Sequence, residues 1–416
     1  MSSVNTAPCP PRSSGSLSCN VTTLTAVISA MTFSASGAAP TPLYQAYQSH
    51  FGLSPFMVTV IFAAYVLCLL LALLTVGSLS DYIGRRPAIL SALAMNVVAM
   101  LIFMTAGSAG ALIVARAVQG FATGFAVTTL GATILDTDRD RAPVLNSVTA
   151  FAGLAAGTLG AGLLVTYAPA PEQLVFVVLL VASAIEAAIL WYMPETAELR
   201  PGAFASLRPR VRVPPAARST FASITPVNVA AWALGGFYFS LMPAVVRVAT
   251  GATLPIVGGV VVAALMFAGG VVVVALRRVG PERMLRSGIV ALTIGVAITL
   301  AGVQYQLVWI MLFGTVVAGL GFGSVFSGAL RSVMPWAKVD ERAALLSAFY
   351  VEGYLAFSLP AVLAGFIAPV VGLTRAADFY GIAVIVLALS SLAATALRKR
   401  IGGQAAVPSK SEGYRS

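Results

Sequence analysis

Long apolar runs follow one another along the chain, separated by short polar segments. Each run is roughly 20 residues long, which at about 1.5 Å per residue is enough to cross the ~30 Å hydrocarbon core of a bilayer. The runs predict transmembrane helices at 22–41, 55–77, 87–106, 110–132, 144–167, 174–193, 223–247, 253–276, 284–304, 307–331, 345–368 and 377–397. The pattern therefore predicts an all-α integral membrane protein with twelve transmembrane helices.

A polar, basic and proline-rich stretch interrupts this series between the sixth and seventh predicted helices. It is too polar to span a membrane, so it divides the chain into two groups of six helices. We expect a disordered cytoplasmic tail, a six-helix bundle, a cytoplasmic linker, a second six-helix bundle and a second cytoplasmic tail. Their predicted ranges are 1–21, 22–193, 194–222, 223–397 and 398–416.

The two halves carry a weak internal repeat. Gly120–Gly124 in the fourth predicted helix leads to the segment 140–142, Asp-Arg-Ala, while Gly319–Gly323 in the tenth leads to the segment 340–343, Asp-Glu-Arg-Ala. A repeat of six helices is typical of two-domain transporters. The spacing thus favours two pseudo-symmetric bundles.

The positions of the charged residues along the chain show what the low charged fraction and the positive net charge indicate. Only 9% of residues are charged, against about 25% in soluble proteins. The net charge of +11 comes from short basic clusters between apolar runs, which is the pattern of cytoplasmic loops facing anionic lipid and not of a nucleic-acid-binding domain. With both termini cytoplasmic, every Lys and Arg except Arg116, Arg247 and Arg375 falls at or near the inner face. The excess of Arg over Lys and the abundant Ala, Gly and Val indicate a GC-rich bacterial genome, and hence a bacterial inner membrane.

The most specific motif is the loop GSLSDYIGRRP, Gly77–Pro87, between the second and third predicted helices. Gly77 and Gly84 permit a tight loop, and Asp81 needs a cationic or helix N-terminal partner. The stretch closely resembles the major facilitator signature G-x-L-[SA]-D-R-x-G-R-[RK]-P, with Tyr82 where Arg or Lys is usual. This resemblance extends over about 24–397.

The resemblance implies two six-helix bundles around a central cavity that work by alternating access. In that family the loop, with Asp81, Arg85 and Arg86, helps to hold the outward-open state. It latches to an acidic residue at the end of the fourth helix and to the start of the eleventh. Asp136 and Asp138 are the candidates for the first partner, and residues near 342–346 for the second.

Two further stretches resemble antiporter motifs. Arg116–Gly120 is similar to R-x-x-Q-G, which the family links to proton transfer; an arginine in a membrane helix is costly, and the alternative is a structural or snorkelling side chain. The fifth predicted helix resembles G-x3-G-P-x2-G-G, although Thr158 replaces the proline and the spacing drifts. The glycines of this stretch permit close helix packing: Gly153, Gly157, Gly160 and Gly162.

Two carboxyl groups, Glu186 and Glu352, lie inside predicted spans. Burial disfavours the charged form of a carboxyl, so each is a candidate proton carrier together with Arg116. The alternative is an interfacial carboxylate paired with a loop arginine. The first helix has no acid, and the cavity candidates are therefore uncharged: Thr32, Ser34, Ser36, Gln119, Trp232, Tyr238 and Ser240. Such a cavity suits a neutral or weakly polar organic solute.

These features predict a secondary transporter that exports small organic compounds in exchange for protons and functions as a monomer. The first alternative is a proton-coupled importer of a sugar or another small metabolite, and the second is a non-transporting membrane sensor of the same fold. The chain carries neither a nucleotide-binding motif nor a nucleophilic triad, so we do not expect an enzyme. His50 is the single histidine, and we expect no metal and no cofactor.

Overall fold

Helices make up nearly all of the computed structural model, which describes residues 18–197, 201–338 and 340–404, and these ranges contain no β-strand. The elements of the first half are α1 (Cys19–Ala38), α2 (Pro40–Phe51), α3 (Pro55–Thr75), α4 (Ser80–Ile83), α5 (Arg85–Met104), α6 (Ala109–Thr137), α7 (Ala142–Tyr167) and α8 (Pro171–Leu190). The elements that follow are α9 (Ala203–Ser206), α10 (Pro215–Ser240), α11 (Met242–Thr250), α12 (Pro255–Ala275), α13 (Pro281–Gln304), α14 (Val308–Val333), a 3-10 turn (Met334–Trp336), α15 (Arg342–Val371) and α16 (Leu373–Gln404).

Within the described residues, 11 helices are long and apolar enough to cross a membrane, or 12 when the bent pair α10 and α11 is taken as one span. The axes of that pair differ by 64°. In the first span α1 passes into α2 at Ala39, which keeps helical backbone angles, so the two helices form one span of 33 residues, Cys19–Phe51. The predicted all-α membrane fold is confirmed.

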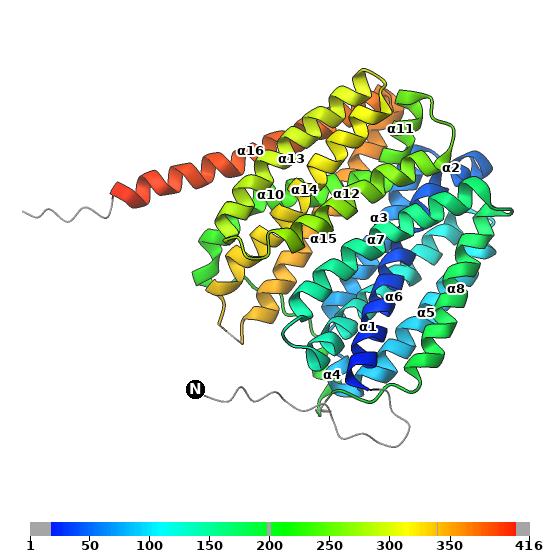
Figure 1. Ribbon diagram of the computed structural model, residues 1–416, viewed down its shortest axis with the longest axis vertical. Coiled ribbons are helices and arrows are strands. Elements are labelled where there is room, and N and C mark those ends of the chain that lie inside the picture. The colour runs from blue at the N-terminus through cyan, green and yellow to red at the C-terminus, as the bar shows by residue number, and fades with distance from the viewer. Residues whose placement is uncertain (1–17, 198–200, 339, 405–416) are drawn as a thin grey trace, which may run out of the picture.

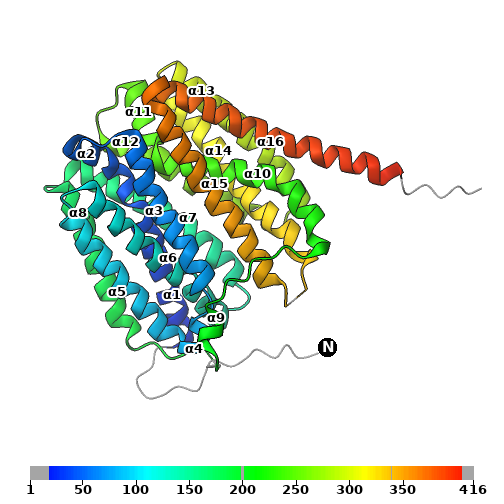
Figure 2. The same ribbon diagram turned by 180° about the vertical axis from the view of Figure 1, so that it is seen from behind.

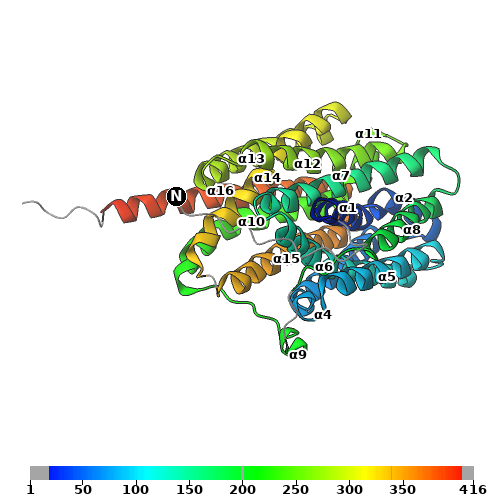
Figure 3. The ribbon, with the colours of Figure 1, turned by 60° about the horizontal axis from the view of Figure 1, so that its bottom comes forward.

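The helices form two groups, α1–α8 and α10–α16, which are side by side in Figures 1 and 2. Within the first group α6 packs on α3, α5 and α1; within the second, α14 packs on α13, α12 and α10. The short α9 lies in the segment that joins the groups and is set apart from both of them in Figure 3. We refer to the two groups as the N bundle and the C bundle.

In each bundle a pair of glycines lets two equivalent helices pack closely against each other. A Cβ atom on Gly120 or Gly124 of α6 would collide with the backbone of α3, at the carbonyl oxygens of Tyr65 and Leu69. A Cβ atom on Gly319 of α14 would likewise meet the Leu265 carbonyl of α12, and one on Gly323 would meet the backbone there as well. The internal repeat in the sequence thus corresponds to the same helix contact in each bundle.

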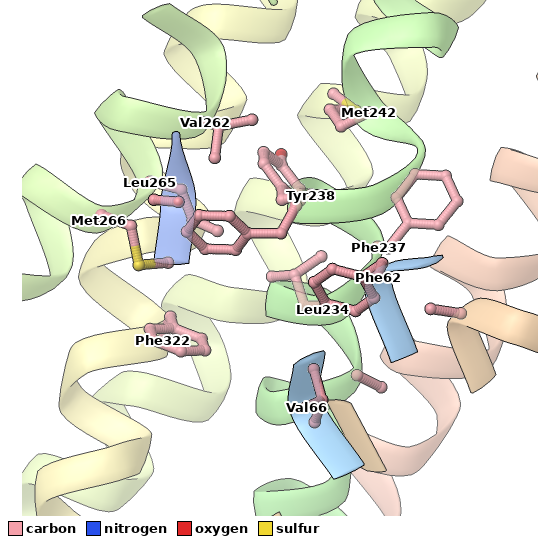
Figure 4. Close-up of a cluster of buried hydrophobic side chains, with 14 of the residues drawn as sticks. Phe62, Val66, Leu234, Phe237, Tyr238, Met242, Val262, Leu265, Met266 and Phe322 are labelled. Atoms are coloured by element: carbon pink, nitrogen blue, oxygen red, sulfur yellow. The ribbon is translucent and has the colours of Figure 1, made fainter. Parts of the chain in front are cut away.

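The bundles meet along two helix pairs, α7 with α12 and α3 with α15. In the first pair the side chain of Phe151 lies against Gly269 and Gly270: a Cβ atom added at Gly269 would come within 2.8 Å of the ring, and one added at Gly270 within 3.0 Å of the Phe151 Cβ atom. Figure 4 shows Phe62 and Val66 of α3 among apolar side chains of α10, α12 and α14 in the C bundle. This contact is made by hydrocarbon and aromatic surfaces.

Hydrogen bonds between the bundles, in the described part of the chain, lie at the end that carries α2 and α11. Thr41 Oγ1 donates to the Phe239 carbonyl at 3.1 Å, and Gln45 Nε2 donates to the Pro243 carbonyl at 2.7 Å. The backbone N–H of Ile256 donates to Thr166 Oγ1 at 3.0 Å. We call this the α2 end, and the opposite end, with α4 and the starts of α1 and α10, the α4 end (Figure 1).

Several boundaries differ from the sequence prediction. Helix α10 begins at Pro215, inside the predicted linker 194–222, because proline suits the first position of a helix where no backbone N–H is needed. Helix α1 begins at Cys19, and α16 continues to Gln404, so residues 19–21 and 398–404 of the predicted tails are helical. The rest of those tails, 1–17 and 405–416, lies outside the described residues.

Candidate functional site

The loop Gly77–Pro87 is organised around the guanidinium group of Arg85, whose side chain is largely buried. Nη1 lies 2.5 Å from Asp81 Oδ1 and donates to Ser80 Oγ at 2.6 Å, while Nε lies 3.1 Å from Asp136 Oδ2. Arg85 therefore joins α4 to the end of α6. Ion pairs of this kind hold two helices in one relative position when the cation is buried.

The two predicted acidic partners behave differently. Asp136 contacts Arg85, whereas Asp138 accepts the backbone N–H of Arg141 at 3.1 Å and lies 3.9 Å from its Nε. Asp138 caps the turn into α7 and so lies outside the contact with the loop. Arg86 lies over the ring of Trp191, 5.2 Å from its centroid.

The second predicted latch, at the start of α15, is not formed with the loop in this structure. Instead, the Ala344 carbonyl accepts a hydrogen bond from the backbone N–H of Arg212, in the segment that joins the bundles, at 3.2 Å. Ser78 Oγ donates to the Ser206 carbonyl of α9 at 3.4 Å. The joining segment thus touches both the loop and the α15 terminus.

Glu195 is a part of this site that was not predicted from the sequence. Its carboxylate accepts the backbone N–H groups of Arg85 at 2.7 Å, Arg86 at 3.2 Å and Ala197 at 3.0 Å. These amides include the free N–H groups at the start of α5, where a helix favours negative charge. The only signal in the sequence is an acid directly after Pro194, at the end of the sixth span.

Gly84 makes the approach of Glu195 possible. Its φ of +100° is a conformation that side-chain-bearing residues rarely adopt, and a Cβ atom there would collide with Glu195 Oε2. Gly77 has a similar steric role, since a Cβ atom on it would collide with the Leu73 carbonyl.

Arg116 is buried in the middle of the N bundle, with 1% of its surface exposed. Nη1 donates to the Gly37 carbonyl at 2.8 Å and to Gln119 Oε1 at 2.7 Å, and Nη2 donates to the hydroxyl of Tyr44 at 2.8 Å. The guanidinium also lies 4.5 Å from the ring centroid of Tyr65. Its neighbours in the described structure are neutral oxygens and aromatic rings, and Nε has no hydrogen-bond partner there.

Gln119 of α6 extends this network to α1, α5 and α8. Its Nε2 donates to both the carbonyl and the hydroxyl of Ser36, at 2.9 and 3.1 Å. Ser36 Oγ in turn donates to Asn96 Oδ1 at 3.1 Å, and Asn96 Nδ2 donates to Ser183 Oγ at 3.3 Å. Ser36 and Gln119 are therefore committed to contacts inside the N bundle. The partners Tyr44, Tyr65, Asn96 and Ser183 were not predicted.

Both membrane carboxyl groups bond to a helix of their own bundle. Glu186 Oε1 accepts a hydrogen bond from Thr32 Oγ1 of α1 at 2.5 Å, and the buried Oε2 has no partner in the described structure. Glu352 of α15 accepts hydrogen bonds from Thr225 at 2.7 Å and Asn228 at 2.8 Å, both on α10. The alternative of a carboxylate paired with a loop arginine is not what the structure shows for either residue.

The remaining cavity candidates divide into two kinds. Ser34 and Ser240 donate to backbone carbonyls one turn earlier in their own helices. Tyr238 points away from the bundle junction, into the C bundle, where its hydroxyl lies 2.9 Å from Thr315 Oγ1 and 3.5 Å from Thr299 Oγ1. It lines a small cavity of about 20 Å³ among α10, α13 and α16, which is large enough for about one water molecule.

Trp232 alone among these candidates lies in an aromatic cluster of its own bundle. Its ring is edge-on to four others at centroid distances of 5.0 to 6.3 Å: Phe326, Tyr350, Tyr354 and Phe357. Phe357 also lies 5.3 Å from Phe62 of the N bundle. The cluster therefore reaches the junction of the two bundles.

The glycines of α7 pack against neighbouring helices with one exception. Gly153 and Gly157 lie against the backbone of α1 at Met31 and Ala35, and a Cβ atom on Gly162 would come within 3.3 Å of Ile256 in the C bundle. A Cβ atom on Gly160 would meet nothing within 4 Å, so Gly160 does not belong to the packing set.

Comparison with known proteins agrees with this arrangement. The family model of the Major Facilitator Superfamily matches residues 23–296. The chain belongs to the Major Facilitator Superfamily. It is thus a multi-pass membrane transporter and not an enzyme. The solved structure of the nucleoside transporter NupG is similar to this facilitator, with a TM-score of 0.71 over 90% of this chain and 99% of that chain, at 11% sequence identity. No curated protein sequence matches the chain.

Proposed function

We propose that this facilitator moves a small organic solute by alternating access, as a monomer in a bacterial inner membrane, with the α4 end and both termini in the cytoplasm. One observation carries the proposal: the hydrogen bonds between the bundles, at Thr41, Gln45 and Ile256, lie at the α2 end. With the α4 end inside, this is an inward-facing state. The loop Gly77–Pro87 and the α15 start, which are not joined here, would meet in the opposite state.

The proposed driving force is the proton gradient. Glu186 and Glu352 lie inside the spans, and in the described structure each accepts hydrogen bonds from hydroxyl or amide donors and has no cation as its partner. A carboxyl group placed inside a membrane span is a candidate carrier of protons. Arg116 would respond to this exchange through the polar network that begins at Gln119.

We propose export as the direction of transport, on the resemblance of Arg116–Gly120 to the antiporter motif R-x-x-Q-G. Import is the second candidate, and the likeness to the structure of a nucleoside transporter is compatible with it. Labelled nucleosides, sugars and aromatic amines, applied to cells and to inverted membrane vesicles, separate the two directions.

Proton coupling is tested with the full-length protein reconstituted in liposomes that contain a pH-sensitive dye. During solute flux down its gradient we expect the internal pH to change, and we expect Glu186→Gln or Glu352→Gln to abolish that change. Glu172→Gln is the matched control, because Glu172 pairs with His50 on the exposed surface. Proton movement that persists unchanged in both buried variants would refute their role in coupling.

A further inference from the structure

An open groove of about 470 Å³ lies on the surface of the N bundle, where the start of α5 meets the end of α8. Its lining comes from one residue of α5, from the last turn of α8 and from the two residues after it: Leu90, Ala187, Ala188, Trp191 and Tyr192. In Figures 1 and 2 these two helices lie on the side of the N bundle that faces away from the C bundle. The groove therefore faces lipid and not the path between the bundles.

Arg86 places a positive charge beside this groove. Its guanidinium lies over the ring of Trp191, 5.2 Å from the centroid, and Trp191 is part of the groove lining. The backbone N–H of Arg86 donates to Glu195 Oε2 at 3.2 Å, but in the described part of the chain its half-buried side chain has no ion pair or hydrogen bond. The charge is thus held at the groove by an aromatic ring and lacks an anion.

The acidic residues near Arg86 are engaged by other groups. Glu195 accepts three backbone N–H groups, two of them at the start of α5, where the helix favours negative charge. Asp81 and Asp136 both contact the guanidinium of Arg85. Arg86 is therefore the cation of this loop that is left for an anion from outside the chain.

The order of polar and apolar groups along the groove matches that of a lipid molecule. Arg86 and Trp191 lie at the α4 end, whereas Leu90 and the two alanines lie one helical turn further into the spans. Trp191 and Tyr192 are 62% and 64% exposed, and such side chains favour the level of lipid headgroups. A charged headgroup and an acyl chain would thus each meet the surface that suits them.

We propose that this groove binds one anionic phospholipid from the leaflet at the α4 end. The phosphodiester accepts hydrogen bonds from the Arg86 guanidinium, whose planar fork suits phosphate oxygens. One acyl chain lies along Leu90 and the two alanines. A zwitterionic lipid fits less well, because its own ammonium group competes with Arg86 for the phosphate. The inference is independent of the transported solute and of the direction of transport.

Native mass spectrometry of the full-length protein in detergent tests the site without a mutation. Dioleoylphosphatidylglycerol is anionic, and dioleoylphosphatidylcholine has the same acyl chains with a zwitterionic headgroup. We expect the first bound phosphatidylglycerol to be held about tenfold more tightly than the first phosphatidylcholine, since hydrogen bonds to charged groups are the stronger ones. Equal affinities would overturn the proposal. Displacement of phosphatidylglycerol by inorganic phosphate would show a site for a free anion and would overturn it as well.

Two charge variants locate the headgroup. Arg86→Gln removes the charge and should weaken phosphatidylglycerol binding about tenfold, to the affinity of phosphatidylcholine. Arg278→Gln is the matched control, because Arg278 is exposed in the corresponding turn of the C bundle, between α12 and α13. Equal losses in the two variants would indicate a diffuse attraction of cations for anionic lipid and would contradict the site.

A second pair of variants tests the groove and leaves Arg86 in place. Ala188→Phe fills the groove from an exposed position, so the protein should fold and should bind both lipids about tenfold more weakly. Ala297→Phe, at an exposed position of α13, adds the same ring elsewhere and should change neither affinity. Unchanged binding in Ala188→Phe would refute the groove as the site of the acyl chain.

Discussion

The carboxylate of Glu195 accepts the backbone N–H of Arg85 at 2.7 Å, directly beside Gly84, whose φ is +100°. A side chain at position 84 would both strain the backbone and displace Glu195. We predict that Gly84→Ala lowers the free energy of unfolding by roughly 2–4 kcal/mol, the sum of these two effects. Thermal unfolding in detergent measures the change.

Gly52→Ala separates the two contributions. Gly52 also has a positive φ, of +63°, but no atom of the described residues, apart from Gly52 and its chain neighbours, lies within 4 Å of its added Cβ. Only the backbone cost, about 1 kcal/mol, is expected there. If both variants were equally destabilised, the contact between Glu195 and the start of α5 would contribute nothing.

The ion pair between Arg85 and Asp136 should be worth more than the neighbouring one at Asp138. Arg85 is nearly buried but keeps Asp81 as a second partner, and the Asp136 side chain is 29% exposed. We therefore predict a loss of about 1 kcal/mol for Asp136→Asn. Asp138→Asn should cost less than about 0.5 kcal/mol, because its partner Arg141 is 80% exposed. Chemical denaturation of the two variants side by side decides whether Asp136 is the partner that matters.

Arg116 should not tolerate lysine. The guanidinium donates in three directions at once, to Gly37, Gln119 and Tyr44, and an ammonium group cannot reproduce that planar fork. We predict that Arg116→Lys lowers stability by roughly 2–3 kcal/mol and abolishes transport. Arg247→Lys, on the exposed surface of α11, is the control and should change neither quantity. Normal flux in Arg116→Lys would show that charge alone suffices.

Hydrogen bonds at the α2 end should set the balance between the two states of the transporter. Thr41→Val combined with Gln45→Leu removes the bonds to the Phe239 and Pro243 carbonyls, at about 1 kcal/mol each. The double variant should therefore favour opening of this end by about 30-fold. Spin labels at His50 and Val248, which are exposed on opposite bundles, report the opening as a longer distance in pulsed resonance measurements.

Ser49→Ala is the comparison for that experiment, because within the described residues the Ser49 hydroxyl bonds only to the Gln45 carbonyl of its own helix. It should leave the distance distribution as it is in the unchanged protein. An identical distribution in the double variant would mean that these bonds do not hold the end closed.

Hydropathy was sufficient to predict the membrane fold, because a span needs only length and apolar composition. The loop Gly77–Pro87 was sufficient for the family, because its residues form a continuous motif. Asp136 and Asp138 could not be told apart from the sequence. They are only two positions apart, yet Asp136 contacts Arg85 while Asp138 caps the turn into α7. The pattern of residues along the chain does not show which way each side chain points.

The polar side chains within the spans were harder to assign for the same reason. Tyr238 and Trp232 are six residues apart on α10, yet one faces the interior of the C bundle and the other an aromatic cluster that reaches the bundle junction. Glu195 and Asn228 escaped prediction because their partners come from segments distant in sequence, Arg85 for the first and Glu352 for the second. Only a folded structure brings those partners together.

The ring of Phe151, seated against Gly269 and Gly270 where α7 meets α12, has a mechanical consequence. A flat ring on a surface of glycines makes only van der Waals contacts. The two helices can therefore shift against each other at this point without breaking a hydrogen bond. In the described structure the Phe151 contact contains no hydrogen bond, whereas the hydrogen bonds between the bundles lie at the α2 end. A methyl group added at Gly270 would come within 3.0 Å of the Phe151 Cβ atom, so we expect Gly270→Ala to push α7 and α12 apart and to slow the transport cycle.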